Sequence, residues 1–139
     1  MARVKLDTGT LSLSPVFEKM TGARVKDCFL DEYSDVLYFI VAPGDMGKAI
    51  GKSGVHIHTA ENLFRKKIRI VEYNDDVATF IRNMIFPLKV ETIGEQDNFV
   101  ILDDTMKKTK SLLIGRDGRN IALLNRAVGR FFSKEIRIA

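Results

Sequence analysis

The pattern of hydrophobic and polar positions predicts the same order of elements in both halves of the chain. Strand-like runs are rich in aromatic and β-branched residues, whereas helical runs repeat apolar residues at spacings of three and four. The first half is expected to form a helix at 14–20, strands at 25–33 and 36–42, helices at 45–50 and about 55–65, and a strand at 67–72. The second half is expected to form a helix at 75–86, strands at 88–93 and 99–102, helices at 109–114 and 119–132, and a strand at 135–138. Each half therefore follows the order α-β-β-α-α-β.

Local signals set several of these boundaries. Ser14 and Pro15 are typical of the first turn of a helix. Asn74 is expected to cap the helix that follows it, and Pro87 to end that helix. The polar run 94–98 is expected to form the turn between the two strands of the second half.

A short glycine motif lies between the two central helices of each half. It reads Ile50-Gly51-Lys52-Ser53-Gly54 in the first half and Ile114-Gly115-Arg116-Asp117-Gly118 in the second, and an isoleucine follows each closing glycine by three residues, at Ile57 and Ile121. Gly51 and Gly115 lie 64 residues apart, an interval typical of a duplicated small unit. Because glycine has no Cβ, such a pair lets the backbone approach a phosphodiester chain closely. The agreement between copies, rather than either motif alone, predicts two nucleic-acid-binding units.

Composition agrees with a duplicated globular protein. The chain has 139 residues, 45% of them hydrophobic, and a net charge of +4 with a pI near 9.3. Residues 1–72 and 73–139 each carry 11 Lys and Arg and 9 Asp and Glu. The basic balance is compatible with a nucleic-acid partner. We expect one domain at 1–73, with a short N-terminal arm at 1–13, and a second domain at 74–139.

Cysteine usage and hydropathy indicate the compartment. Cys28 is the single cysteine, so an internal disulfide is excluded. A single cysteine is compatible with a protein of the reducing cytoplasm. Cys28 lies between apolar neighbours in an expected strand, which favours a core position over a nucleophile. No run approaches 18 consecutive apolar residues, and residues 1–7 lack the apolar core of a signal peptide. We therefore expect a cytoplasmic protein with no membrane partner.

The paired motifs resemble the hallmark of the K-homology (KH) family, I-G-x-x-G between two helices with an isoleucine three residues later. Two strands before the motif and one after it are similar to the prokaryotic, type II arrangement. Two such units over residues 14–139, with no other domain, resemble the archaeal NusA family of transcription factors. The resemblance implies an α+β fold of two tandem type II KH domains, each a three-stranded sheet covered by helices.

The same resemblance implies function and site residues. KH domains bind about four nucleotides of single-stranded RNA or DNA at the glycine loop. The chain is thus expected to be a non-enzymatic, single-stranded RNA-binding transcription factor without cofactors, acting in elongation or termination, with RNA polymerase or another transcription complex as a candidate partner. The implied RNA-binding residues are Ile50, Gly51, Lys52, Ser53, Gly54, Ile57, Ile114, Gly115, Arg116, Asp117, Gly118 and Ile121.

Some side chains near the loops allow two interpretations. Ser53 and Asp117 occupy positions where an N-cap would lie, so they either cap a helix or contact RNA. The negative charge of Asp117 would repel a phosphate, and Arg116 beside it is expected to offset this charge. Candidate phosphate contacts that are equally compatible with solvated surface are Lys48, Lys110, Arg119, Lys107 and Lys108.

Other functions find less support in the sequence. Residues 47–53 nearly match a phosphate-binding P-loop, but three residues separate the glycines where four are needed. His56 and His58 have no cysteine partners for a zinc site, so no metal is expected. The alternatives left open are a KH-type RNA-binding protein of a ribosome-associated or RNA-processing assembly, and a protein-interaction scaffold that no longer binds RNA.

Overall fold

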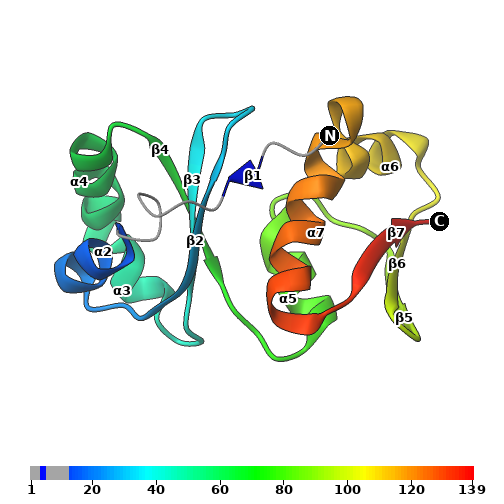
Figure 1. Cartoon of the computed structure of the whole chain (residues 1–139), viewed down its shortest axis with the longest axis horizontal. Helices are drawn as coiled ribbons and strands as arrows, with labels where there is room; N and C mark the ends of the chain where they lie inside the picture. Colours follow the sequence, from blue (N-terminus) through cyan, green and yellow to red (C-terminus); the bar gives the residue numbers. More distant parts are fainter. Residues whose placement is uncertain (1–3, 6–12) are drawn as a thin grey trace. The chain divides into compact units, whose positions relative to one another are not determined.

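The computed structural model describes residues 4–5 and 13–139, with side chains from residue 13 onward. By its internal contacts the described chain divides into two compact units, Val4–Asn74 and Asp75–Ala139. Each unit contains one β-sheet and its own helices (Figure 1). The predicted α+β class, with two KH-like units in tandem, is confirmed.

The first unit carries its helices on one face of its sheet (Figure 1). Its elements are β1 (Val4–Lys5), α2 (Leu13–Thr21), β2 (Val25–Asp31), β3 (Val36–Val41), α3 (Met46–Ile50), the 3₁₀ turn η1 (Lys52–Gly54), α4 (Val55–Phe64) and β4 (Lys67–Glu72). The sheet order is β1-β2-β3-β4, with β2 antiparallel and β4 parallel to β3. The three strands expected here are present, and β1 adds a fourth that was assigned to the N-terminal arm. A two-residue edge strand has too few side chains to create an alternating pattern.

Aromatic stacking joins the helices of the first unit to its sheet. Phe17 of α2 stacks on Phe39 of β3 with ring centroids 4.1 Å apart, and Phe64 of α4 lies 6.1 Å from Phe39. Ala49 of α3 and Ala60 of α4 are fully buried in the same cluster. Their small side chains let both helices that flank the glycine loop lie close to the sheet.

A buried aspartate fixes the start of the first loop-flanking helix in each unit. Asp45 Oδ2 accepts a hydrogen bond at 2.9 Å from the amide of Arg24, the residue just before β2. In the second unit Asp104 accepts from the amides of Glu91 at 3.0 Å and Met106 at 2.9 Å. Each carboxylate thus accepts from the amide of the residue just before the first long strand of its unit, although Asp45 is the N-cap residue of α3 and Asp104 lies two residues before the N-cap of α6.

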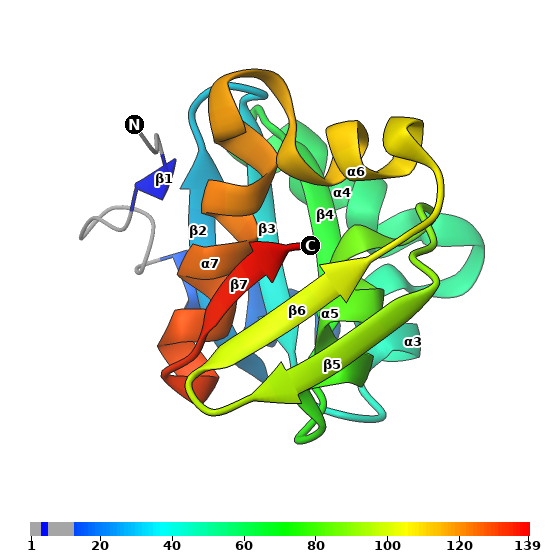
Figure 2. The same ribbon diagram turned by 90° about the vertical axis from the view of Figure 1, so that its right-hand side faces the viewer.

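The second unit repeats the arrangement with a three-stranded sheet (Figure 2). Its elements are α5 (Val77–Ile85), β5 (Thr92–Gln96), β6 (Phe99–Asp103), α6 (Lys107–Ile114), the 3₁₀ turn η2 (Arg116–Gly118), α7 (Arg119–Phe132) and β7 (Glu135–Ile138). The sheet order is β5-β6-β7, with β5 antiparallel and β7 parallel to β6. Within the described residues, no helix of either unit is long and apolar enough to cross a membrane.

Two predicted boundaries in the second unit are wrong. The first strand begins at Thr92 rather than at residue 88, and it continues through Gly94 to Gln96, which pairs with Phe99. The turn is therefore shorter than the expected run 94–98. β5 is an edge strand whose side chains are mostly exposed, so it lacks the apolar alternation that would have marked it.

The cap of α5 is also shifted from its predicted position. Asp76, not Asn74, is the N-cap, and its carboxylate accepts from the Thr79 amide at 3.1 Å and the Thr79 hydroxyl at 2.7 Å. Both residues are good caps, so propensity alone could not separate two polar positions so close together.

The pKa of Asp45 generates a prediction about acid stability. The Arg24 amide that donates to this carboxylate holds its pKa below the ordinary value of 3.8, and the charges of Lys48 and Arg24 act in the same direction. A carboxyl group with a lowered pKa stabilises the folded state when the pH is above that ordinary value. This stabilisation is lost as the pH falls through the folded-state pKa. We expect Asp45→Asn to unfold at lower urea concentration at pH 7 and to show a shallower loss of stability below pH 4. The measurement is urea unfolding of the full chain between pH 7 and pH 3.

The control for this experiment is Asp35→Asn. Asp35 pairs with Lys66 on the exposed surface, so its removal should change the free energy of unfolding little. Identical acid dependence in Asp45→Asn and in the native chain would contradict the assignment.

Candidate nucleic-acid interface

The first glycine loop reverses the chain between α3 and α4 through left-handed backbone. Gly51 has φ 77° and ψ 166°, Ser53 has φ 55° and ψ 27°, and Gly54 has φ 75° and ψ 17°. The Gly54 amide donates to the Gly51 carbonyl at 3.1 Å, which closes a single 3₁₀ turn. The conformation at Gly51 is one that only glycine adopts readily.

The second loop has the same backbone conformation. Gly115 has φ 75° and ψ 173°, Asp117 has φ 56° and ψ 25°, and Gly118 has φ 75° and ψ 18°. The Gly118 amide donates to the Gly115 carbonyl at 3.2 Å. Corresponding angles in the two loops differ by less than about ten degrees, which is within the ordinary scatter of one conformation.

Ser53 and Asp117 do not cap the helices that follow them, so that interpretation is wrong. The N-cap positions are Gly54 and Gly118, and neither α4 nor α7 has a side-chain cap hydrogen bond. The tight reversal moves the cap one residue later than expected and places the preceding residue in the left-handed region. A non-glycine residue there is disfavoured by about 1–2 kcal/mol, which is a cost typical of functional loops.

Backbone amides remain available at the tip of the first loop. The amides of Gly54 and Val55 donate to the carbonyls of Gly51 and Lys52 within the turn. Among the described residues, none accepts a hydrogen bond from the Lys52 or Ser53 amide. These two donors lie directly before the N-terminus of a ten-residue helix, where backbone partial charges favour an anion.

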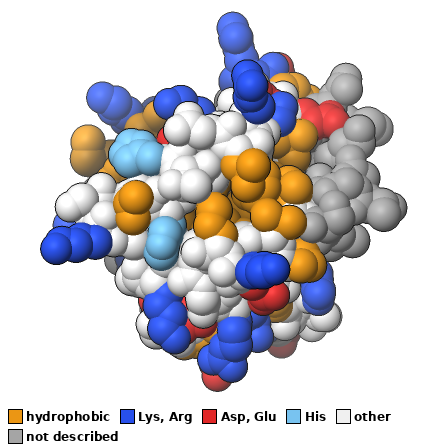
Figure 3. Space-filling view, turned by 90° about the vertical axis from the view of Figure 1, so that its left-hand side faces the viewer, with side chains coloured by type: hydrophobic (Ala, Val, Ile, Leu, Met, Phe, Trp, Pro, Cys, Tyr) orange, Lys and Arg blue, Asp and Glu red, His pale blue; other side chains and the backbone are white. Residues whose placement is uncertain are grey.

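The surroundings of the first loop are cationic. Lys52 is exposed, and Lys48 exposes 62% of its side chain with its ammonium 3.9 Å from Asp45. The chain's two histidines, His56 and His58, lie in the first turn of α4. Figure 3 shows both histidine side chains on the helical face of this unit, with lysine and arginine side chains beside them.

The surroundings of the second loop are less positive. Leu112 stands where the first unit has Lys48, and about half of it is exposed. Asp117 is paired with Arg119 at 3.9 Å, so Arg119 rather than the expected Arg116 offsets its charge.

Lys110 is also engaged within the second unit. Its ammonium lies 3.1 Å from Asp103, and its hydrogen bond lowers the pKa of that carboxyl, with the Asp104 amide contributing in the same direction. Of the candidate phosphate contacts, Lys48 is therefore more available than Lys110 or Arg119.

The four isoleucines of the motifs differ in burial. Ile50 and Ile57 are half-buried and pack against the core of the first unit. Ile121 is half-buried, whereas Ile114 is 39% exposed. Each loop is thus bordered by apolar surface.

Two side chains that span the loops were not predicted from the sequence. His56 Nδ1 donates to the Lys48 carbonyl at 2.7 Å, and Asn120 Nδ2 donates to the Leu112 carbonyl at 2.8 Å. Both residues are the second of their helix and lie 64 positions apart, the interval that separates the two loops. That shared register is the sequence signal that distinguishes this pair.

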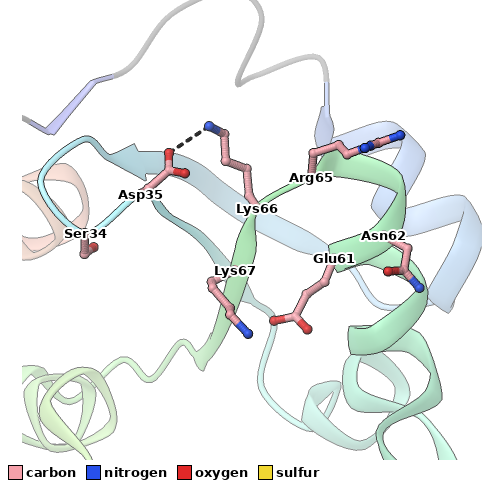
Figure 4. Close-up of a pocket in the computed structure, with 7 residues that line it drawn as sticks. All are labelled: Ser34, Asp35, Glu61, Asn62, Arg65, Lys66 and Lys67. Carbon is pink, nitrogen blue, oxygen red and sulfur yellow. Dashed lines mark hydrogen bonds and ion pairs between the residues drawn. The ribbon is translucent and has the colours of Figure 1, made fainter.

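A pocket of about 430 Å³ lies at the far end of α4 from the loop (Figure 4). It is lined by Ser34, Asp35, Glu61, Asn62, Arg65, Lys66 and Lys67. Lys66 donates to Asp35 at 2.7 Å. A ten-residue helix spans about 15 Å, so this mixed-charge pocket is separate from the glycine loop. Across the described residues, no three His, Cys, Asp or Glu side chains are grouped so that they could hold a metal ion.

Comparisons with known proteins identify relatives in archaea. The chain is 35% identical over 122 residues to the probable transcription termination protein NusA of Methanococcus vannielii, covering 86% of this chain and 69% of that one. It is 33% identical over 132 residues to the protein of the same name from Halococcus morrhuae, covering 94% of each. The crystal structure of APE1850 matches with a TM-score of 0.74 and 26% identity, covering 96% of this chain and all of that one. No family model matches the chain.

The loop geometry predicts unequal effects of alanine at the two glycines of one motif. A Cβ on Gly51 would lie 2.7 Å from His56 Cγ, whereas a Cβ on Gly54 would lie 3.8 Å from its nearest neighbour, His58. We expect Gly54→Ala to lower the free energy of unfolding by about 1–2 kcal/mol, the ordinary cost of a left-handed residue. Gly51→Ala should cost more, because both its backbone conformation and the contact are unfavourable. Urea unfolding of the full chain measures both.

The second loop supplies the matched comparison for that experiment. A Cβ on Gly115 would lie 2.7 Å from Asn120 Cγ, and one on Gly118 would lie 3.9 Å from Ile121. The same order of effects is expected for Gly115→Ala and Gly118→Ala. Equal losses at both glycines of either loop would contradict the prediction.

Proposed function

Because the chain belongs to the archaeal NusA family of transcription termination proteins, we propose that it binds single-stranded RNA through its two glycine loops and acts in transcription elongation and termination. The observation that carries the proposal is the repeated loop conformation. Both loops place left-handed backbone before a helix N-terminus, and the first has two amides that no described residue engages. A phosphate oxygen is the ligand that such donors suit best.

In this proposal the motif residues have separate roles. The four glycines let the RNA backbone approach, and Lys52 and Arg116 supply positive charge to the phosphates. Apolar surface beside each loop receives the bases, whose exposed edges are where single-stranded RNA is read. The residues of that apolar surface are Ile50, Ile57, Ile114 and Ile121.

The proposal assigns unequal affinity to the two loops. Lys48 and Lys52 are exposed beside the first loop, and the ammonium of Lys48 lies 3.9 Å from the Asp45 carboxylate. In the second loop Asp117 is 77% exposed, so it presents a negative charge that its pair with Arg119 offsets only in part. The first loop is therefore the stronger phosphate site, and Lys48 is its additional contact.

The proposal predicts a strong effect of reversing the charge at both loop tips. Lys52→Asp with Arg116→Asp should lower RNA affinity sharply and reduce the slope of log affinity against log salt, by about 0.7 for each phosphate that is no longer neutralised. The native slope should lie near −2 to −3.5, if about three to five phosphates are neutralised. The measurement is fluorescence anisotropy of a mixed-sequence single-stranded RNA of about twelve nucleotides, long enough for two sites of about four nucleotides each.

A matched double variant tests whether the effect is local. Lys67→Asp with Lys89→Asp makes the same change in charge at exposed lysines outside the loops. It should lower affinity much less, because only long-range attraction is altered. Unchanged affinity in a folded Lys52→Asp, Arg116→Asp variant would overturn the assignment of the loops.

The place of the protein in transcription needs a separate experiment. Affinity capture from native extract, with and without ribonuclease, should recover RNA polymerase or another transcription complex. Recovery of ribosomal subunits without polymerase would overturn the transcription role and leave a KH protein of a ribosome-associated assembly.

A further inference from the structure

We propose that His56 and Asn120 are positioning residues that hold the two glycine loops in their binding shape. Each side chain reaches from the start of one helix to a carbonyl near the end of the preceding helix, across the loop that joins them. The proposal deepens the proposed function and rests on it for the ligand. The loop-closing hydrogen bond itself can be tested without RNA.

The carbonyl in question lacks a partner within its own helix. In α3 the Gly51 amide donates to the Gly47 carbonyl, and the next carbonyl, that of Lys48, accepts the hydrogen bond from His56. In α6 the Gly115 amide donates to the Ser111 carbonyl, and the next carbonyl, that of Leu112, accepts the hydrogen bond from Asn120. The last four carbonyls of a helix have no intrahelical amide, so a donor supplied from across the loop satisfies one of them.

The two residue types are equivalent for this task. Histidine and asparagine both carry a nitrogen at the δ position, one atom beyond Cγ, and a carbonyl oxygen can only accept. The histidine must therefore carry a proton on Nδ1, which both its neutral Nδ1–H form and its charged form do.

The same side chains explain the first glycine of each motif. His56 Cγ would lie 2.7 Å from a Cβ on Gly51, and Asn120 Cγ would lie 2.7 Å from a Cβ on Gly115. The loop-closing side chain thus occupies the space that any other residue would need. The first glycine serves the loop-closing contact as well as the approach of RNA.

The loop has few other bonds that hold it. Within the turn, the amides of the closing glycine and of the first helical residue donate to carbonyls of the motif. One residue of each loop, Ser53 or Asp117, is a non-glycine residue with positive φ, and this strained conformation favours opening. Without the loop-closing bond, RNA would have to order the loop as it binds, and affinity would fall.

The test compares variants that lack the side-chain donor with variants in which each loop carries the donor residue of the other loop. His56→Leu and Asn120→Leu remove the donor, whereas His56→Asn and Asn120→His install in each loop the donor of the other. Loss of one hydrogen bond corresponds to about 3- to 10-fold weaker binding of the twelve-nucleotide RNA. We expect that loss in each leucine variant and recovery to within about twofold in the exchanged variants, measured by anisotropy on the full chain.

Amide hydrogen exchange separates this proposal from the proposed function. The amides of Gly54 and Gly118, which close the turns, should exchange faster in the corresponding leucine variant, while that of Phe39 in the sheet core is unchanged. If the native chain binds no RNA, the proposed function fails and exchange alone decides the role of His56 and Asn120. Asn120→Asp is a further variant of nearly identical shape that replaces the donor by an acceptor, so it tests the second loop should the leucine variant not fold.

Unchanged exchange at the loop amides in the leucine or aspartate variants would overturn the proposal. So would a loss of RNA affinity that the exchanged donors fail to restore, since that result would indicate a direct contact of each particular side chain with RNA. Faster loop exchange, weaker binding and recovery by the exchanged donor together support it.

Discussion

The reversal of the chain between two helices within four residues is the constraint on which each unit depends. Such a reversal needs positive φ at three positions, and in both loops two of these are glycines. The third is Ser53 in one loop and Asp117 in the other, which shows that the geometry is imposed by the turn rather than by local preference. Within the turn the amides of Gly54 and Val55 find acceptors, whereas no described residue accepts a hydrogen bond from the amides of Lys52 and Ser53.

A loop of this kind keeps its shape only if the two helices beside it are fixed. In the first unit Ala49 and Ala60 are fully buried and bring α3 and α4 down onto the sheet. Asp45 fixes the start of α3 through the Arg24 amide, and Asp104 does the same before α6. The reversal therefore extends from a pair of anchored helices, and its remaining freedom lies in the few residues that His56 or Asn120 spans.

The sequence predicted the elements that bury one face and missed those that do not. α7 and β7 have the expected boundaries because their apolar residues recur at regular spacing and are buried, as at Leu124 and Ile136. β1 and β5 are edge strands; β1 has only two residues and the side chains of β5 are mostly exposed, so β1 was not predicted and β5 was misplaced. The position of the glycine loops was predictable from their repetition. Their loop-closing side chains were not, because a histidine and an asparagine share no pattern of hydropathy.

The two copies show which properties of the loop can vary independently. Backbone angles, the buried carboxylate and the loop-closing bond are the same in both, although the loop-closing residue differs. Charge is not the same, because Lys48 is replaced by Leu112 and Ser53 by Asp117. Shape depends on contacts of under 4 Å and tolerates only substitutions that reproduce them, whereas electrostatic attraction sums over many exposed groups. Two loops can therefore keep one shape while their charges differ, and in the proposed function most of the attraction for phosphate is concentrated at the first loop.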